Sequence, residues 1–127
     1  MAPRPTWRRA AAAIEYALIL PALLLFVFGL IDTGRLLWTY TTLNRAVEAA
    51  ARCGAINTTD CGTTAQIKSR AVTEAWGLTI ETTAFTVATA SCGIQVIGNY
   101  NFTFIIPSLG FTDLGTITLT AKACYPA

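Results

Sequence analysis

One long apolar segment near the N-terminus limits what this chain can fold into. From Ala10 to Ile31 the only ionisable side chains are Glu15 and Tyr16, and from Ala17 to Ile31 there are none. About 20 apolar residues are enough to cross the hydrocarbon core of a bilayer as a helix. The segment therefore predicts a membrane-spanning helix, provided that the carboxylate of Glu15 is tolerated near one end.

Charged residues on either side of this segment predict its orientation. Arg4, Arg8 and Arg9 precede it, whereas Asp32 and Arg35 follow it directly. Arg and Lys collect on the cytoplasmic side of membrane spans. We therefore expect a single-pass membrane protein with its N-terminus in the cytoplasm and its C-terminal part exported.

All four cysteines lie beyond the apolar segment, which agrees with export to a compartment where disulfides form. Three pairings are open. We favour Cys53 with Cys61, which closes a short loop rich in Asn, Thr and Gly, and Cys92 with Cys124 across a sheet; four buried thiols are the alternative. Because the chain has no histidine and no C-x-x-C pattern, we expect no metal and no cofactor.

Helical periodicity continues beyond the apolar segment. Apolar residues recur at spacings that place them on one helix face: Leu36, Tyr40, Leu43, Val47 and Ala50. We expect either one long helix or two coaxial helices separated at the polar residues 32–35, with Gly54 as the stop signal. The face is explained by packing in the core of a small domain or, alternatively, by binding a partner.

The rest of the chain changes from a helical to an extended pattern. A second helix is predicted from Thr63 or Thr64 to about Trp76, with Gly77 ending it. Beyond Gly77, β-branched residues dominate 79–90, and two later stretches alternate between apolar and polar residues, namely 94–106 and 117 to the C-terminus. These patterns predict an α+β fold, in which a long N-terminal transmembrane helix extends into a small exported domain with a second helix and about three antiparallel strands.

The polar residues do not combine into a catalytic or nucleic-acid-binding site. The chain has no histidine, and its serines, Ser69, Ser91 and Ser108, are scattered, so no nucleophile with a base can be placed by spacing. Acidic and basic residues nearly balance beyond the apolar segment, which argues against a nucleic-acid partner. We expect a protein that is not an enzyme and has no small-molecule substrate.

Glu15 is the unusual residue of the apolar segment. A carboxylate costs about 2.5 to 3.5 kcal/mol at the centre of a membrane helix, and less near an end, so it marks a functional site by default. The simpler explanation is that Glu15 lies at the interface and reaches toward the cytoplasm beside Arg8 and Arg9.

A combination of short motifs runs through residues 10–52. The motifs are Glu15 followed by the aromatic Tyr16, Ala-Leu-x-x-Pro ending at Pro21, Gly29, Asp32-x-Gly34-Arg35, and Ala-Ala-Arg at 50–52. With the basic leader before it, this combination resembles the N-terminal domain of TadE-like proteins, the minor pilins or pseudopilins of tight-adherence, type IV-like pilus systems. It covers about a third of the chain.

The resemblance implies how Glu15 is tolerated. A prepilin peptidase would cut between Ala10 and Ala11, making Glu15 the fifth residue of the mature chain and creating an α-amino group near its carboxylate, on the same chain or a neighbour. The family usually has glycine before the cut, where this chain has Ala10. Pro21 would then be a flexible point when subunits move from bilayer to filament.

The resemblance also implies a domain organisation and partners. Residues 1–10 would be the leader, 11–34 the transmembrane helix, 35–56 its extension and 57–127 the exported domain. The partners would be the bilayer, the prepilin peptidase, the pilus assembly platform, other minor pilins and the major pilin. The location would be the inner (cytoplasmic) membrane, with the C-terminal domain in the periplasm or cell exterior and the pilus as a further location. The alternative is an uncleaved, single-span anchored protein with an exported binding or adhesive domain. Asp32 and Arg35 either pair at the outer interface or simply mark the end of the span.

Overall fold

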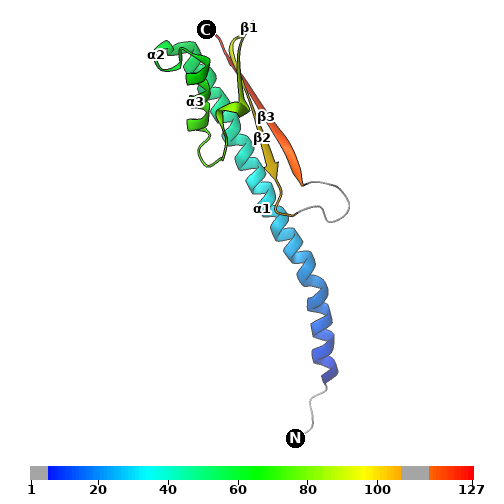
Figure 1. Ribbon diagram of the computed structural model, residues 1–127. Coiled ribbons are helices and arrows are strands. Elements are labelled where there is room, and N and C mark those ends of the chain that lie inside the picture. The colour runs from blue at the N-terminus through cyan, green and yellow to red at the C-terminus, as the bar shows by residue number, and fades with distance from the viewer. Residues whose placement is uncertain (1–5, 107–114) are drawn as a thin grey trace.

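The computed structural model describes residues 6–106 and 115–127. Its elements follow in the order α1 (Thr6–Ile56), α2 (Thr58–Cys61), α3 (Thr64–Glu74), the 3-10 turn η1 (Thr82–Ala84), β1 (Phe85–Ala90), β2 (Gly93–Thr103) and β3 (Thr116–Tyr125). Figure 1 shows α2, α3 and the strands gathered along the C-terminal half of α1, while its N-terminal half extends beyond them. This layout confirms the predicted α+β fold.

Helix α1 is one uninterrupted helix rather than two coaxial ones. Pro21 lies inside it, and helix continues on both sides. The polar residues 32–35 do not interrupt the helix: the Thr33 hydroxyl donates to the Gly29 carbonyl at 2.8 Å, and the Asp32 carboxylate accepts from Arg35 of the same helix and from the backbone N–H of Ile105. The membrane-capable segment and the domain are therefore joined by continuous helix.

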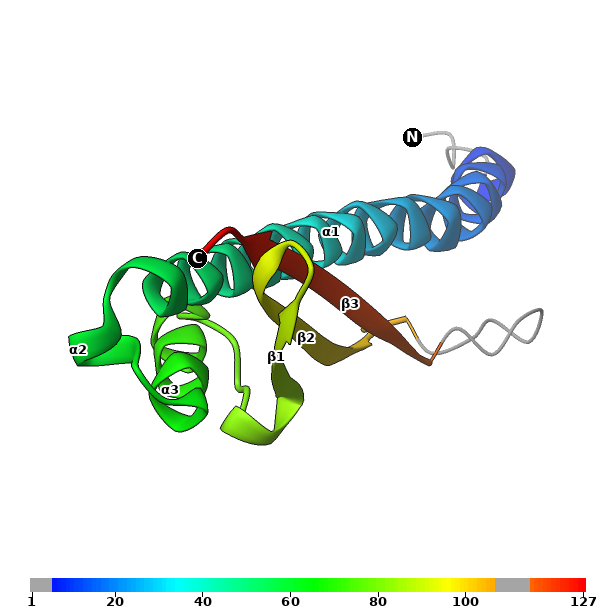
Figure 2. The ribbon, with the colours of Figure 1, turned by 90° about the horizontal axis from the view of Figure 1, so that it is seen from above.

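The three strands form an antiparallel sheet in the order β1-β2-β3. Val96 of β2 lies opposite Val87 on one side and Ala123 on the other. One face of the sheet packs on α1 (Figure 2), and the other is polar: the hydroxyls of Thr118 and Thr120 donate to the side-chain oxygens of the asparagines facing them across the strands, at 2.9 and 2.8 Å. The alternation of apolar and polar residues predicted for β2 and β3 thus corresponds to one sheet face packed on α1 and one polar face.

The core lies where the sheet meets α1. Its largest fully buried side chains are Leu43 and Val47 of α1 together with Phe85 and Val96 of the sheet. Alanines supply the rest of the helix face, and their small side chains allow the sheet to approach closely (Ala46, Ala50 and Ala51). The face predicted from periodicity is therefore mainly a core face.

At the N-terminal end of the predicted face, the buried side of α1 differs from the predicted one. Tyr40 remains 45% exposed and Leu36 is only half-buried, whereas Thr39 and Thr42 are buried in their place. The sheet lies over the threonine side of α1 at this level, so position rather than hydrophobicity decides which residues are covered.

Gly54 is not the stop signal of α1, since the helix continues to Ile56. A Cβ at Gly54 would lie 2.7 Å from Cδ1 of Ile67 and 3.2 Å from Cγ2 of Ile94. The glycine is required for close packing between α1, α3 and β2, and the prediction that it ends the helix was wrong.

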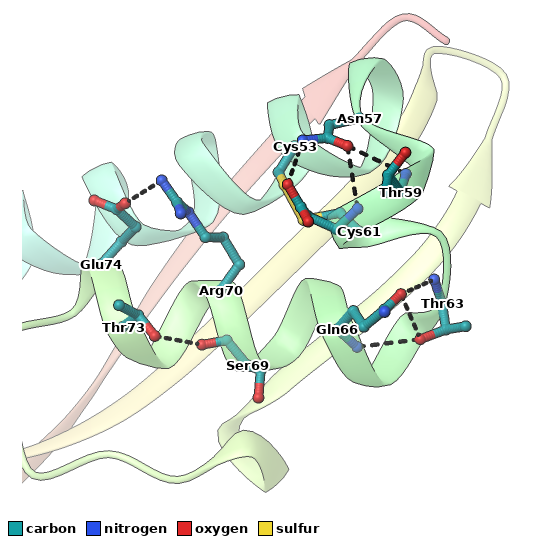
Figure 3. Close-up of a disulfide and its surroundings, with 11 residues drawn as sticks. Cys53, Asn57, Thr59, Cys61, Thr63, Gln66, Ser69, Arg70, Thr73 and Glu74 are labelled. Atoms are coloured by element: carbon teal, nitrogen blue, oxygen red, sulfur yellow. Dashed lines mark hydrogen bonds and ion pairs between the residues drawn. A yellow bond between two sulfur atoms is a disulfide. The ribbon is translucent and has the colours of Figure 1, made fainter.

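Two caps and a disulfide arrange the turn after α1 (Figure 3). The Asn57 side chain accepts the N–H groups of Thr59 and Asp60, both at 3.1 Å. Thr63 and Gln66 form a reciprocal capping box, in which each side chain accepts the backbone N–H of the other. This box fixes the start of α3 at the position predicted from the sequence.

Both disulfides join the pairs that we favoured from the sequence. Cys53 pairs with Cys61 at a Cα–Cα distance of 5.7 Å, and Cys92 pairs with Cys124 at 6.2 Å. The first bridge closes the turn between α1 and α3. The second fastens the turn between β1 and β2 to the end of β3.

Candidate functional site

The first candidate surface is the N-terminal half of α1, which the rest of the described chain leaves uncovered (Figure 1). Its large apolar side chains are exposed from Ile14 to Ile31. Among the described residues, α1 is the one helix that is long and apolar enough to cross a membrane. Exposed apolar surface on this scale normally marks contact with a membrane or a partner, and the helix is compatible with a single-pass membrane anchor.

The residues predicted for processing and assembly lie on this uncovered part. Ala10, Ala11, Glu15, Tyr16 and Pro21 are all exposed. The bond between Ala10 and Ala11 lies close to the start of α1. Any role for these five residues therefore depends on what surrounds the helix rather than on contacts within the domain.

The second candidate surface is built around Asp32, where the apolar segment ends. Asp32 is 4% exposed, and its carboxylate accepts the backbone N–H of Ile105 at 2.9 Å and of Ile106 at 3.2 Å. Nη1 of Arg35 donates to the same carboxylate at 2.9 Å. The Asp32–Arg35 pair considered from the sequence is thus present, and it has a further function in holding the chain beyond β2 against α1.

The Arg35 guanidinium extends this arrangement to the sheet, since its carbon lies 5.2 Å from the centroid of the Phe102 ring. We call Asp32, Arg35, Phe102, Ile105 and Ile106 the Asp32 clamp. The clamp explains why the strand does not continue to residue 106 with the alternating pattern. The Phe104 N–H still donates to the Gly115 carbonyl at 3.3 Å, whereas the N–H groups of Ile105 and Ile106 are directed to Asp32.

Two tryptophans meet just above the clamp. The rings of Trp38 and Trp76 are 5.6 Å apart in an edge-to-face arrangement, yet each side chain is about half exposed. Gly77, with φ of 85°, turns the chain here, and a Cβ at this position would lie 3.9 Å from Nε1 of Trp38. The tryptophan contact therefore fixes the C-terminal end of α3 beside the segment of α1 that follows the apolar run.

Two surface cavities lie along α1, and the first of them borders the clamp and Trp38. One, of about 420 Å³, is lined by Arg35, Trp38, Gly77, Tyr100 and Phe102 among others. The other, of about 550 Å³, lies between α1 and β3. In the described part of the chain, no group of three or more His, Cys, Asp or Glu side chains is placed to hold a metal ion.

Sequence reasoning missed the backbone partners of Asp32 and the tryptophan pair. Ile105 lies 73 positions from Asp32, and no local pattern indicates which distant N–H groups a carboxylate will meet. The available signal was a lone aspartate at the end of an uncharged helix segment, which indicates a partner without naming it. The connection between the last two predicted strands, residues 107–114, lies outside the described residues.

The comparison with protein families agrees with the resemblance seen in the sequence. Residues 10–52 match the family model described as TadE-like protein. The match lies within α1 and includes the uncovered apolar half, Asp32 and Arg35, and most of the helix face that enters the core. No curated protein and no solved structure matches the chain.

Proposed function

We propose that this chain acts as a TadE-like minor pilin, or pseudopilin, in the assembly of a tight-adherence, type IV-like pilus. The observation that carries the proposal is that the family match falls on a single helix with two different halves. The first half is apolar and uncovered, and the second is part of the domain core. A subunit that is held in a bilayer and later packs through its helix requires this division.

The proposal places the apolar segment across the inner membrane, with the N-terminus in the cytoplasm and the domain outside. In this orientation the uncovered helix contacts lipid first. Other minor pilins, the major pilin and the assembly platform are its later partners. The absence of a recognisable acid–base pair or nucleophile in the sequence supports a structural role over an enzymatic one.

Processing by a prepilin peptidase is part of the proposal. Cleavage between Ala10 and Ala11 removes the leader at a point where α1 has few backbone hydrogen bonds to lose. The α-amino group released there carries a positive charge close to Glu15, on the same chain or on a neighbouring subunit. An opposite charge within a few ångströms offsets the cost of holding the carboxylate away from water.

The first test is the intact mass and N-terminal sequence of the protein from host membranes that contain the peptidase. We expect a mature chain beginning at Ala11. The variant Ala10→Gly should be cleaved at least as completely, because it restores the residue usual before the cut. An intact leader in both forms would contradict the processed-pilin mechanism and favour an uncleaved, membrane-anchored binding or adhesive protein.

The second test concerns the carboxylate. Breaking a buried ion pair by removing one partner costs about 3–5 kcal/mol, so Glu15→Ala should reduce piliation strongly while leaving the domain fold unchanged. Glu48→Ala is the matched control, because Glu48 is an exposed carboxylate on the same helix but within the domain. Normal piliation by a cleaved Glu15→Ala chain would show that charge compensation is not the function of Glu15.

A further inference from the structure

The end of the domain nearest the apolar segment exposes large apolar side chains from three separate parts of the chain. Trp38 comes from α1, Trp76 follows α3, and Ile105 follows β2; their exposed fractions are 51%, 54% and 49%. With the half-exposed guanidinium of Arg35, we call these residues the tryptophan face. The Asp32 clamp holds Ile105 and Arg35 in place, and the contact between the two indole rings holds Trp76 against Trp38.

The tryptophan face lies at a defined height above the apolar segment. Asp32, which holds Ile105, directly follows Ile31, the last residue of the apolar segment. Trp38 lies seven positions after Ile31, which is about 10 Å along a helix that rises 1.5 Å per residue. Side chains on a helix lean toward its N-terminus, which brings the Trp38 ring lower than its own Cα. The headgroup layer adds roughly 5–7 Å on each side of the hydrocarbon core. The tryptophan face therefore lies at headgroup height when the apolar segment occupies the core.

We propose that the domain rests on the outer headgroup layer of the bilayer through the tryptophan face, so that a phospholipid surface is the partner of the domain as well as of the helix. This inference depends on the proposed insertion of α1 in the membrane. Its basis is continuity: the exposed indoles and Ile105 begin where the uncovered apolar side chains of α1 end.

The chemistry of the tryptophan face suits this partner. Indole rings collect at membrane interfaces because they combine an apolar body with an N–H donor. Arg35 gives only Nη1 to Asp32 and remains 46% exposed, so further guanidinium donors are available to lipid phosphate. Asp32 itself is covered by the clamp, which keeps its carboxylate from facing the lipid.

Depth-dependent quenching of tryptophan fluorescence tests the inference on the full chain. The protein is reconstituted in vesicles of phosphatidylcholine and phosphatidylglycerol that carry a nitroxide either on the headgroup or deep in the acyl chain. Trp7→Phe, combined with Trp38→Phe or Trp76→Phe, leaves one tryptophan of the face. We expect the headgroup nitroxide to quench each of these two variants at least twofold more strongly than the deep nitroxide.

Two controls make the outcomes distinct. In a chain without its own tryptophans, Thr120→Trp places an indole on the exposed face of the sheet and should not be quenched by either lipid. The variant Trp38→Phe/Trp76→Phe, kept as the uncleaved chain, has only Trp7, near the start of α1, and reports whether the helix is in the bilayer.

Quenching of Trp7 without quenching of Trp38 and Trp76 would overturn the inference and leave the proposed function standing. Acrylamide, a quencher dissolved in water, separates a further outcome. If Trp38 and Trp76 are shielded from acrylamide but are not quenched by the nitroxide lipids, the inference is overturned and the tryptophan face is assigned to contact between protein copies. If Trp7 is not quenched either, the helix is not inserted, and the inference and the proposed function fail together.

Discussion

Gly98 of β2 packs directly against Val47 of α1, and its substitution by alanine tests the packing between the sheet and the helix. A Cβ at this position would lie 2.8 Å from Cε1 of Phe85 and 3.0 Å from Cγ1 of Val47. Both neighbours are fully buried, so neither side chain can move aside into solvent. Adding a methyl group to a well-packed core costs about 1–3 kcal/mol.

The stabilising effect of replacing glycine with alanine is smaller than this packing cost. The φ of Gly98 is not positive, so alanine can adopt its backbone conformation, and the restriction of the unfolded chain returns about 0.4–1 kcal/mol. We therefore expect Gly98→Ala to lower the free energy of unfolding by about 1–2 kcal/mol. For a domain of this size, that corresponds to a decrease in Tm of roughly 5–15 °C.

Gly34→Ala is the matched control. No described neighbour lies within 4 Å of a Cβ built there, and Gly34 is inside a helix, where alanine is favoured over glycine by about 0.5–1 kcal/mol. Thermal unfolding of the full chain in detergent micelles, followed by near-UV circular dichroism, should show a lower Tm for Gly98→Ala and an unchanged or higher Tm for Gly34→Ala. Equal changes in Tm of the same sign for the two variants would refute the packing argument. A double-mutant cycle of Gly98→Ala and Phe85→Leu that shows no coupling between the two positions would also refute it.

Two further changes test the clamp and the disulfides. Asp32→Ala should speed hydrogen exchange at the amides of Ile105 and Ile106, because these N–H groups lose their acceptor; unchanged exchange would mean that the clamp does not persist in solution. Each disulfide is removed in turn by replacing its two cysteines with serine. Loss of Cys92–Cys124 should lower the free energy of unfolding by about 3.5 kcal/mol and loss of Cys53–Cys61 by about 2.5 kcal/mol, because the first bridge closes a loop of 32 residues and the second a loop of 8. The opposite order in denaturant unfolding would show that loop entropy is not the main contribution.

The features predicted correctly from the sequence are those set by neighbouring residues. The capping box of Thr63 and Gln66 is complete within four positions, so the start of α3 could be located. The alternation along β2 and β3 reflects one covered and one open sheet face, and this alternation is visible within the sequence of each strand alone. The apolar run of α1 is visible for the same reason.

The errors occur where distant elements meet. Gly54 has the residue type of a helix stop, but its environment is set by Ile67 and Ile94, which arrive from other elements. Tyr40 is more hydrophobic than Thr39, yet the threonine is buried because the sheet lies on that side of α1. For Asp32 the carboxylate could be noticed, whereas its acceptor role toward the chain after β2 required the folded arrangement.

The placement of β3 against α1 has a consequence for biogenesis. Strand β3 contacts α1 although the two are far apart in the sequence, and Ala121 of β3 is buried in the shared core. Because chains emerge N-terminus first, α1 is synthesised while the surface that will receive β3 is still empty. Core closure is therefore a late, long-range event, slow by the measure of contact order. Since Cys124 lies near the end of β3, formation of its bridge to Cys92 can serve as a biochemical marker of the molecules that have completed this final step.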